Sequence, residues 1–107
     1  MALMDRLTDA AVAAALHDLA GWTRVGDAIV ARYACAGFPE AIALVTRIGF
    51  LAEAVNHHPD LDIRWRWVQV LLTTHDAGGL TANDVALAGQ IAAAARSMGA
   101  EAVPPLS

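Results

Sequence analysis

The sequence contains a single cysteine and no lysine, and each shortage limits what the protein can be. Because Cys35 has no second cysteine to pair with, an intramolecular disulfide is excluded, together with the disulfide frameworks of small secreted domains. All seven basic residues are arginines, against eleven Asp and Glu, and the formal net charge is −4. A dedicated nucleic-acid-binding protein needs a clustered cationic face, so we expect no direct nucleic-acid partner.

The chain also lacks a long uninterrupted apolar run. Its longest apolar stretch, Ala41–Val55, contains Thr46, Arg47 and Glu53, and it is shorter than the roughly 20 apolar residues needed to cross a bilayer. Acidic residues interrupt every apolar run near the N-terminus, and no basic segment precedes one, which argues against a signal peptide. We therefore expect a cytoplasmic protein with no membrane partner.

What is present is a high apolar content in a short chain. Hydrophobic residues make up 57% of the 107 residues, which predicts a packed domain rather than a disordered one. A chain of this length holds one core, so we expect a single domain over residues 1–107 with an ordered core at about 7–98. Much of the apolar content is alanine, which buries little area per residue, so we expect a partner surface to complete the core.

Capping and turn residues divide the chain into seven expected elements. The expected helices cover residues 10–19, 39–56 and 82–98, and the first is capped by Thr8 or Asp9. The expected strands, 22–25, 28–35 and two more within 61–74 where the chain folds back near Arg66, are rich in β-branched and aromatic residues. The order α-β-β-α-β-β-α predicts an α+β fold in which helices are layered on an antiparallel sheet.

Three short features refine this assignment. Thr81 and Asp84 have the spacing of a capping box at the start of the third helix. Residues 77–79, Ala-Gly-Gly, are expected to form a flexible loop, and they lack the spacing and the lysine of a phosphate-binding loop. Residues 103–105, Val-Pro-Pro, are expected to be a frayed tail.

The second expected helix, residues 39–56, is apolar on more than one side. Its large apolar residues are Ile42, Val45, Ile48, Phe50, Leu51 and Val55. A helix that is apolar around most of its circumference is usually buried on two sides. In a domain this small, we expect the second side to contact another subunit.

Three of the four histidines are expected to gather at one hairpin. His57 and His58 follow the second helix, and His75 ends the last strand, so the fold-back of the intervening segment can bring them together. Imidazole exchanges protons near neutral pH, so such a group could supply a general acid and a general base. Adjacent histidines rarely converge on one ion and Cys35 is on a different element, so we expect no metal. An ordinary surface role is the alternative, and it is the one expected for His17.

Other side chains have both a structural and a functional interpretation. Asp84 fits a helix cap, and Glu53 fits an exposed helical charge. Trp22, Trp65 and Trp67 fit core or half-buried sheet positions, although flat heterocycles also stack on such rings.

Several of these residues, taken with their spacing, match a known pattern. The spacing along the chain is Glu53, three residues, His57-His58-Pro59, five residues, Trp65, nine residues, His75, eight residues and Asp84. This spacing resembles the signature of the pterin-4a-carbinolamine dehydratase family. The segment Thr73–Thr81, followed by Asp84 and by Leu87-Ala88, is also similar, as are Gly21-Trp22 and Phe38 upstream. The resemblance extends from about Leu7 to Ala95.

The resemblance implies a four-stranded antiparallel sheet with three helices packed on one face, and a homodimer or homotetramer. It implies a hydro-lyase, 4a-hydroxytetrahydrobiopterin dehydratase, which converts 4a-hydroxytetrahydropterin to quinonoid dihydropterin. This step recycles tetrahydropterin after aromatic amino acid hydroxylation and belongs to tetrahydrobiopterin biosynthesis. The family uses no metal or cofactor, and the pterin is its small-molecule substrate.

By the same resemblance, His57 and His75 would be the acid–base pair, and His58 would hold and polarise the substrate. Which of the pair is the acid stays open. Asp84 would support His75 or the loop, and Glu53 would support the two adjacent histidines. Trp22 and Trp65 would contact the substrate ring.

The chain departs from the family at Trp65-Arg66-Trp67, where the family often has Tyr, Asn and a basic residue. Arg66 replaces an amide that favours a tight bend, which concerns the hairpin more than the histidines. The family also includes non-catalytic members, and these supply the rival hypothesis: a binding or assembly module that stabilises a transcription factor's dimer or takes part in carboxysome and RuBisCO assembly. The complete set of histidines favours the enzyme, since a scaffold has no physical need for them.

Overall fold

The structure of residues 5–106, a computed structural model, contains three α-helices, one short 3₁₀ helix and five β-strands within that range. In chain order they are α1 (Asp9–His17), β1 (Thr23–Val25), β2 (Ala28–Ala34), α2 (Phe38–Ala54), β3 (Asp60–Arg64), β4 (Trp67–Leu72), the 3₁₀ helix His75–Ala77, α3 (Ala82–Ser97) and β5 (Glu101–Val103). Thr8 caps α1, and Thr81 with Asp84 forms the expected capping box of α3.

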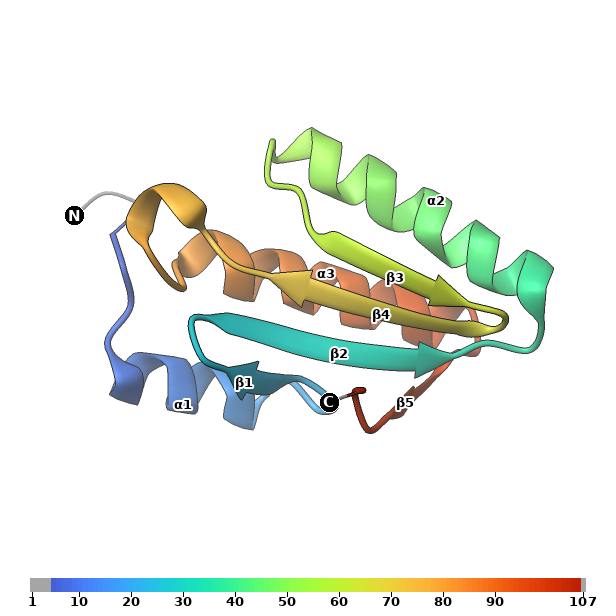
Figure 1. Ribbon diagram of the computed structural model, residues 1–107, viewed down its shortest axis with the longest axis horizontal. Helices are drawn as coiled ribbons and strands as arrows, with labels where there is room; N and C mark the ends of the chain where they lie inside the picture. Colours follow the sequence, from blue (N-terminus) through green and yellow to red (C-terminus); the bar gives the residue numbers. More distant parts are fainter. Residues whose placement is uncertain (1–4, 107) are drawn as a thin grey trace.

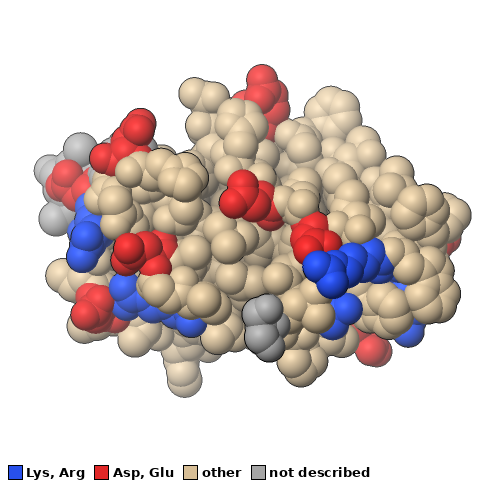
Figure 2. Space-filling view, in the orientation of Figure 1, with Lys and Arg blue, Asp and Glu red and all other residues tan. Residues whose placement is uncertain are grey.

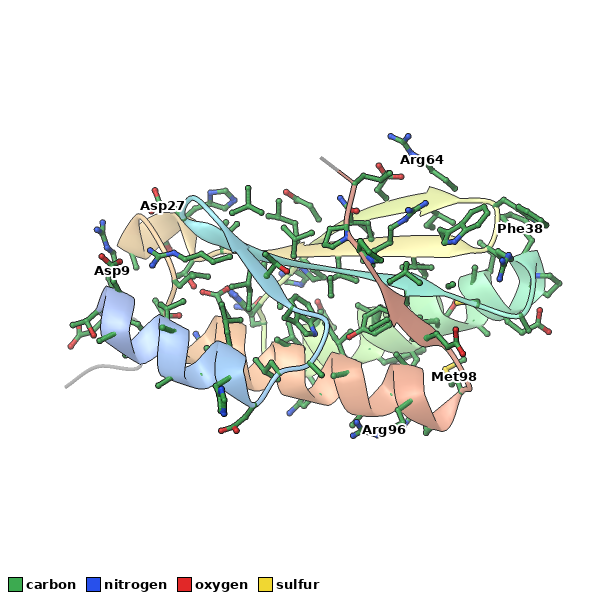
Figure 3. The ribbon with its side chains drawn as sticks, turned by 90° about the horizontal axis from the view of Figure 1, so that it is seen from below. Asp9, Asp27, Phe38, Arg64, Arg96 and Met98 are labelled. Carbon is green, nitrogen blue, oxygen red and sulfur yellow. The ribbon has the colours of Figure 1, made fainter. Side chains whose placement is uncertain are left out.

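The strands form one antiparallel sheet in the order β1-β2-β4-β3. β1 and β5 share the remaining edge of β2, since β1 pairs with residues 28–30 and β5 with residues 32–34. The three α-helices cover one face of this sheet, and no helix within residues 5–106 covers the other (Figures 1 and 3). The expected α+β fold is therefore confirmed, with one short strand added to the four that were expected.

The fold-back between β3 and β4 occurs at Trp65 and Arg66, as the sequence predicts. Trp65 has a φ of +52°, which is uncommon for a bulky residue. The Arg66 guanidinium lies 5.5 Å from the Trp65 ring and 4.8 Å from the Trp67 ring, and its Nη1 donates to the Cys35 carbonyl at 3.1 Å. These contacts hold a turn that contains neither glycine nor asparagine.

Helix α2 has two apolar faces. Ala41, Leu44, Ile48 and Ala52 recur at helical spacing and are buried against the sheet and α3. Phe38, Ile42 and Phe50 are 51%, 40% and 75% exposed. The two-sided apolar character expected from the sequence is confirmed, and the outer face is available to a partner.

The C-terminal segment is more ordered than expected. Residues 101–103 form β5, because an extended chain there gains main-chain hydrogen bonds to the free edge of β2, and Val103 of this strand belongs to the segment 103–105 that was predicted to fray. Ala102 packs against Gly21, whose φ is +90° and where an added Cβ would lie 2.6 Å from the Ala102 Cβ. Beyond the strand, the Leu106 N–H donates to Gln69 Oε1 at 2.7 Å. The prediction of a frayed tail at residues 103–105 was therefore wrong at Val103.

The surface seen in Figure 2 carries its basic side chains toward two ends of the molecule, and acidic side chains lie both among them and between the two ends. No helix within residues 5–106 is both long and apolar enough to cross a membrane.

Candidate functional site

A pocket of about 290 Å³ opens between the end of α2 and the end of β4. Its lining residues are Asn56, His57, His58, Thr73, Thr74, His75 and Asp76. The volume is near the lower end of the range for small-molecule sites. The structure thus brings the three histidines selected from the sequence to one pocket.

The end of α2 places the first two histidines. Asn56 adopts a left-handed conformation with φ +50°. The N–H groups of Asn56 and His57 donate to the carbonyls of Glu53 and Ala52, at 3.2 and 3.1 Å. This is a Schellman motif, which ends the helix and reverses the chain direction. The reversal directs His57 and His58 toward the loop after β4.

The loop after β4 places the third histidine. His75 begins a 3₁₀ helix, and Thr74 and Gly79 form a bridge that closes the loop behind it. The Thr73 hydroxyl donates to the Asp27 carbonyl at 2.6 Å, which ties this loop to the β1–β2 turn. The expectation of a flexible loop at residues 77–79 was therefore wrong: Ala77 belongs to the 3₁₀ helix, and Gly79 is paired.

His57 is held by a carboxylate that the fold buries completely. Its Nε2 lies 2.6 Å from Asp84 Oδ1, and the Asp84 side chain is 0% exposed. The other oxygen, Oδ2, accepts hydrogen bonds from the Thr74 hydroxyl at 2.7 Å and from the Thr81 N–H at 2.9 Å. Both carboxylate oxygens are therefore occupied, which a buried charge requires.

A second hydroxyl completes this network. Thr81 Oγ1 lies 2.9 Å from Thr74 Oγ1, and because the Thr74 proton already points to Asp84, Thr81 is the donor. The carboxylate cannot rotate away without breaking several buried hydrogen bonds.

The contact also fixes how His57 can react. An ionised carboxylate only accepts hydrogen bonds, so the ring nitrogen facing Asp84 carries a proton. Within residues 5–106, no group bonds the other nitrogen, Nδ1, and the carboxylate can stabilise the imidazolium by a charge-assisted hydrogen bond. The resemblance implied that Asp84 supports His75 or the loop. The structure places it on His57 and on the loop threonines, and not on His75.

The other two histidines are held less tightly. His58 Nε2 lies 2.8 Å from Glu53 Oε1, as the resemblance implied, but the two side chains are 58% and 78% exposed. Water and salt weaken an ion pair at such a position. Within residues 5–106, no side chain bonds the His75 ring. His58 and His75 can therefore adjust to a bound molecule more readily than His57.

Two tryptophans expected to contact the substrate lie away from this pocket. Trp22 is buried in the core, where its Nε1 donates to the Tyr33 hydroxyl at 3.0 Å. Burial raises the pKa of the Tyr33 hydroxyl, so Tyr33 stays protonated at neutral pH. Trp65 is at the β3–β4 turn, at the opposite end of the hairpin from the pocket (Figure 1). Neither ring lines the pocket formed by this chain.

Sequence reasoning missed Thr74, the buried hydroxyl that orients Asp84. Its position directly before His75 was the only available signal. Within residues 5–106, no group of three or more His, Cys, Asp or Glu side chains is placed to hold a metal ion.

Comparison with known proteins identifies the family of this chain. Residues 5–94 match the family described as pterin 4 alpha carbinolamine dehydratase. The chain belongs to this family. A relative from Roseiflexus sp. (strain RS-1), named "Putative pterin-4-alpha-carbinolamine dehydratase", is 57% identical over 86 residues, which cover 80% of this chain and 92% of the relative. A relative of the same name from Thermomicrobium roseum is 51% identical over 89 residues, 83% of this chain and 96% of the relative.

Solved dehydratase-family structures share the fold. A transcriptional coactivator/pterin dehydratase from Brucella melitensis superposes with a TM-score of 0.82 at 31% identity, covering 85% of this chain and 99% of that one. A pterin dehydratase-like RuBisCO assembly factor of the alpha-carboxysome superposes with a TM-score of 0.58 at 19% identity, covering 69% of this chain and 86% of that one. At that identity the second likeness shows the fold alone.

Proposed function

We propose that this protein dehydrates a 4a-hydroxytetrahydropterin to quinonoid dihydropterin, and so recycles tetrahydropterin. The observation that carries the proposal is the meeting of His57, His58 and His75 at one pocket, with His57 bound to a buried carboxylate. The family membership supports it, since relatives over 50% identical carry the dehydratase name.

The reaction needs one proton donor and one proton acceptor. The C4a–O bond breaks as a proton reaches the leaving oxygen, and water departs. The N5–H proton is removed, and its electron pair forms the N5=C4a double bond. No oxidant or reductant is consumed, so general acid–base catalysis suffices without a cofactor.

The pocket offers residues for these roles. His57 and His75 form the acid–base pair, and His57 acts through Nδ1 because Asp84 holds its Nε2. His58, which is exposed and paired with Glu53, holds and polarises the substrate. Asp84 positions His57 directly, and Thr74 does so through its hydrogen bond to Asp84.

A stopped-flow assay tests the proposal. The 4a-hydroxy intermediate is generated in the instrument, and the loss of its ultraviolet absorbance is followed with and without the purified protein. We expect the protein to accelerate the loss in proportion to its concentration. An unchanged spontaneous rate would favour the rival hypothesis, a binding or assembly module with the same fold.

A further inference from the structure

A second pocket, of about 300 Å³, lies directly beside the first. Its lining residues are Asp27, Ala28, Thr73, His75, Gly78 and Gly79. Thr73 and His75 line both pockets, so these two side chains form the wall between them. The two pockets therefore meet at Thr73 and His75.

Two contacts hold the second pocket in shape. The β1–β2 turn, with Gly26 at φ +60°, places Asp27 at the end of the sheet that faces the loop after β4 (Figure 3). The hydrogen bond from the Thr73 hydroxyl to the Asp27 carbonyl joins the turn to that loop. Gly78 and Gly79 also line the pocket, and Gly79 is fixed by its bridge to Thr74.

The polar groups of this pocket mostly accept hydrogen bonds. Within residues 5–106, no side chain or backbone group bonds the Asp27 carboxylate. The Thr73 hydroxyl donates its only proton to the Asp27 carbonyl, so it can only accept a hydrogen bond from a ligand. A ligand group that pairs with Asp27 and Thr73 must donate hydrogen bonds, and the Asp27 charge disfavours an anion beside it. A hydroxyl group meets both conditions.

The geometry of a pterin relates the two pockets. N5 lies between C4a, which loses the hydroxyl, and C6, which carries the side chain. An acid–base pair that serves C4a and N5 therefore stands next to C6, and the C6 substituent leaves the ring beside that pair. His75 is the member of the pair that both pockets share.

We infer that the second pocket receives the C6 substituent of the pterin and that Asp27 selects a hydroxylated alkyl side chain. This inference rests on the proposed dehydratase function and deepens it. Asp27 is then a specificity residue: it contacts the substrate's side chain, and it takes no part in breaking the C4a–O bond.

The test compares two substrates and two variants. Dehydration is measured for 4a-hydroxytetrahydropterins that carry either a 1,2-dihydroxypropyl or a methyl group at C6. Asp27→Ala removes both carboxylate acceptors and should lower kcat/KM for the dihydroxypropyl substrate by about tenfold, mainly through KM, as expected for the loss of a hydrogen bond to a charged group. The methyl substrate should change less than about twofold, because it makes no such bond.

Asp27→Asn keeps a turn-forming residue and one acceptor, and should give a smaller loss confined to the dihydroxypropyl substrate. Asp18→Ala is the matched control, since this exposed carboxylate lines neither pocket. Equal effects of Asp27→Ala on both substrates would overturn the inference and leave the dehydratase function standing. So would a higher kcat/KM for a phosphorylated side chain, which would assign the pocket to an anion near Arg6. If the wild-type protein accelerates neither substrate, the proposed function fails, and this inference fails with it.

Discussion

At the scale of single residues, Asp84 connects the folding of α3 to the chemistry of the pocket. The same carboxylate accepts the Thr81 N–H as part of the capping box and binds His57 with its other oxygen. A residue that only capped the helix could remain partly exposed, whereas Asp84 is fully buried. We propose that the burial serves the contact with His57 as well as the helix cap.

Replacing Asp84 by Asn tests that purpose. The amide keeps the size of the side chain but loses the charge that stabilises the His57 imidazolium. Since hydrogen bonds to charged groups contribute about 1.5–3 kcal/mol, we expect kcat to fall by about 10- to 100-fold. The measurement is single-turnover stopped-flow absorbance.

Glu53→Gln is the matched comparison, because Glu53 makes the same kind of pair with His58 at an exposed position. An exposed pair contributes little, so we expect its rate to change less than about threefold. Equal losses in the two variants would mean that burial of the carboxylate has no role in the reaction.

The sequence predicts part of this residue-scale picture. The spacing of Thr81 and Asp84 is a local signal, so the capping box could be found without a structure. The contact between Asp84 and His57 joins residues 27 positions apart, and the burial of Thr74 depends on how β4 and α3 pack. Periodicity and spacing carry no information on such contacts.

At the scale of elements, β5 depends on the glycine that it packs against. Gly21→Ala places a methyl group 2.6 Å from the Ala102 Cβ at a backbone φ of +90°. Strain and overpacking together should lower the free energy of unfolding by about 2–4 kcal/mol, measured by urea denaturation.

Two other glycines separate the causes. Gly26 also has a positive φ, but open space surrounds it, so Gly26→Ala should lower the free energy of unfolding by about 1 kcal/mol through strain alone. At Gly49, within α2, an added methyl group meets open space, so Gly49→Ala should raise the free energy of unfolding by about 0.5–1 kcal/mol. If Gly21→Ala lowered the free energy of unfolding no more than Gly26→Ala does, the contact between Gly21 and Ala102 would not stabilise the fold.

Elements with strong local signals were predictable, and elements that depend on tertiary pairing were not. The helix starts at Thr8 and Thr81 follow from capping residues, and the fold-back near Arg66 follows from the excessive length of a single strand. Residues 101–103 are too short to show a strand pattern and precede two prolines. Their conformation is set by the open edge of β2, which no local pattern reveals.

At the scale of the whole molecule, the outer face of α2 is the strongest reason to propose an oligomer. Phe50 is 75% exposed there, and the neighbouring strand β3 adds Leu61 and Ile63, which are 37% and 39% exposed. We propose that a second copy covers this surface and that the protein is at least a homodimer.

Phe50→Asp tests the proposed homodimer. Burying a phenylalanine contributes about 1.5–3 kcal/mol, so the dissociation constant should rise at least about tenfold, as measured by light scattering over a dilution series. Val25→Asp is the matched control, because Val25 is 58% exposed on β1, away from α2. A wild-type protein that is a stable monomer at micromolar concentration would contradict the proposal.

The central claim is that His57 and His75 act together on one substrate in the pocket between α2 and β4. Its most direct test is stopped-flow dehydration by the wild-type protein, His57→Ala and His75→Ala, with His17→Ala as the control from α1. We predict that each of the first two variants loses about 10²-fold or more in kcat, the usual contribution of an acid–base group, while the control keeps wild-type activity. Near-wild-type dehydration by both His57→Ala and His75→Ala would contradict the account.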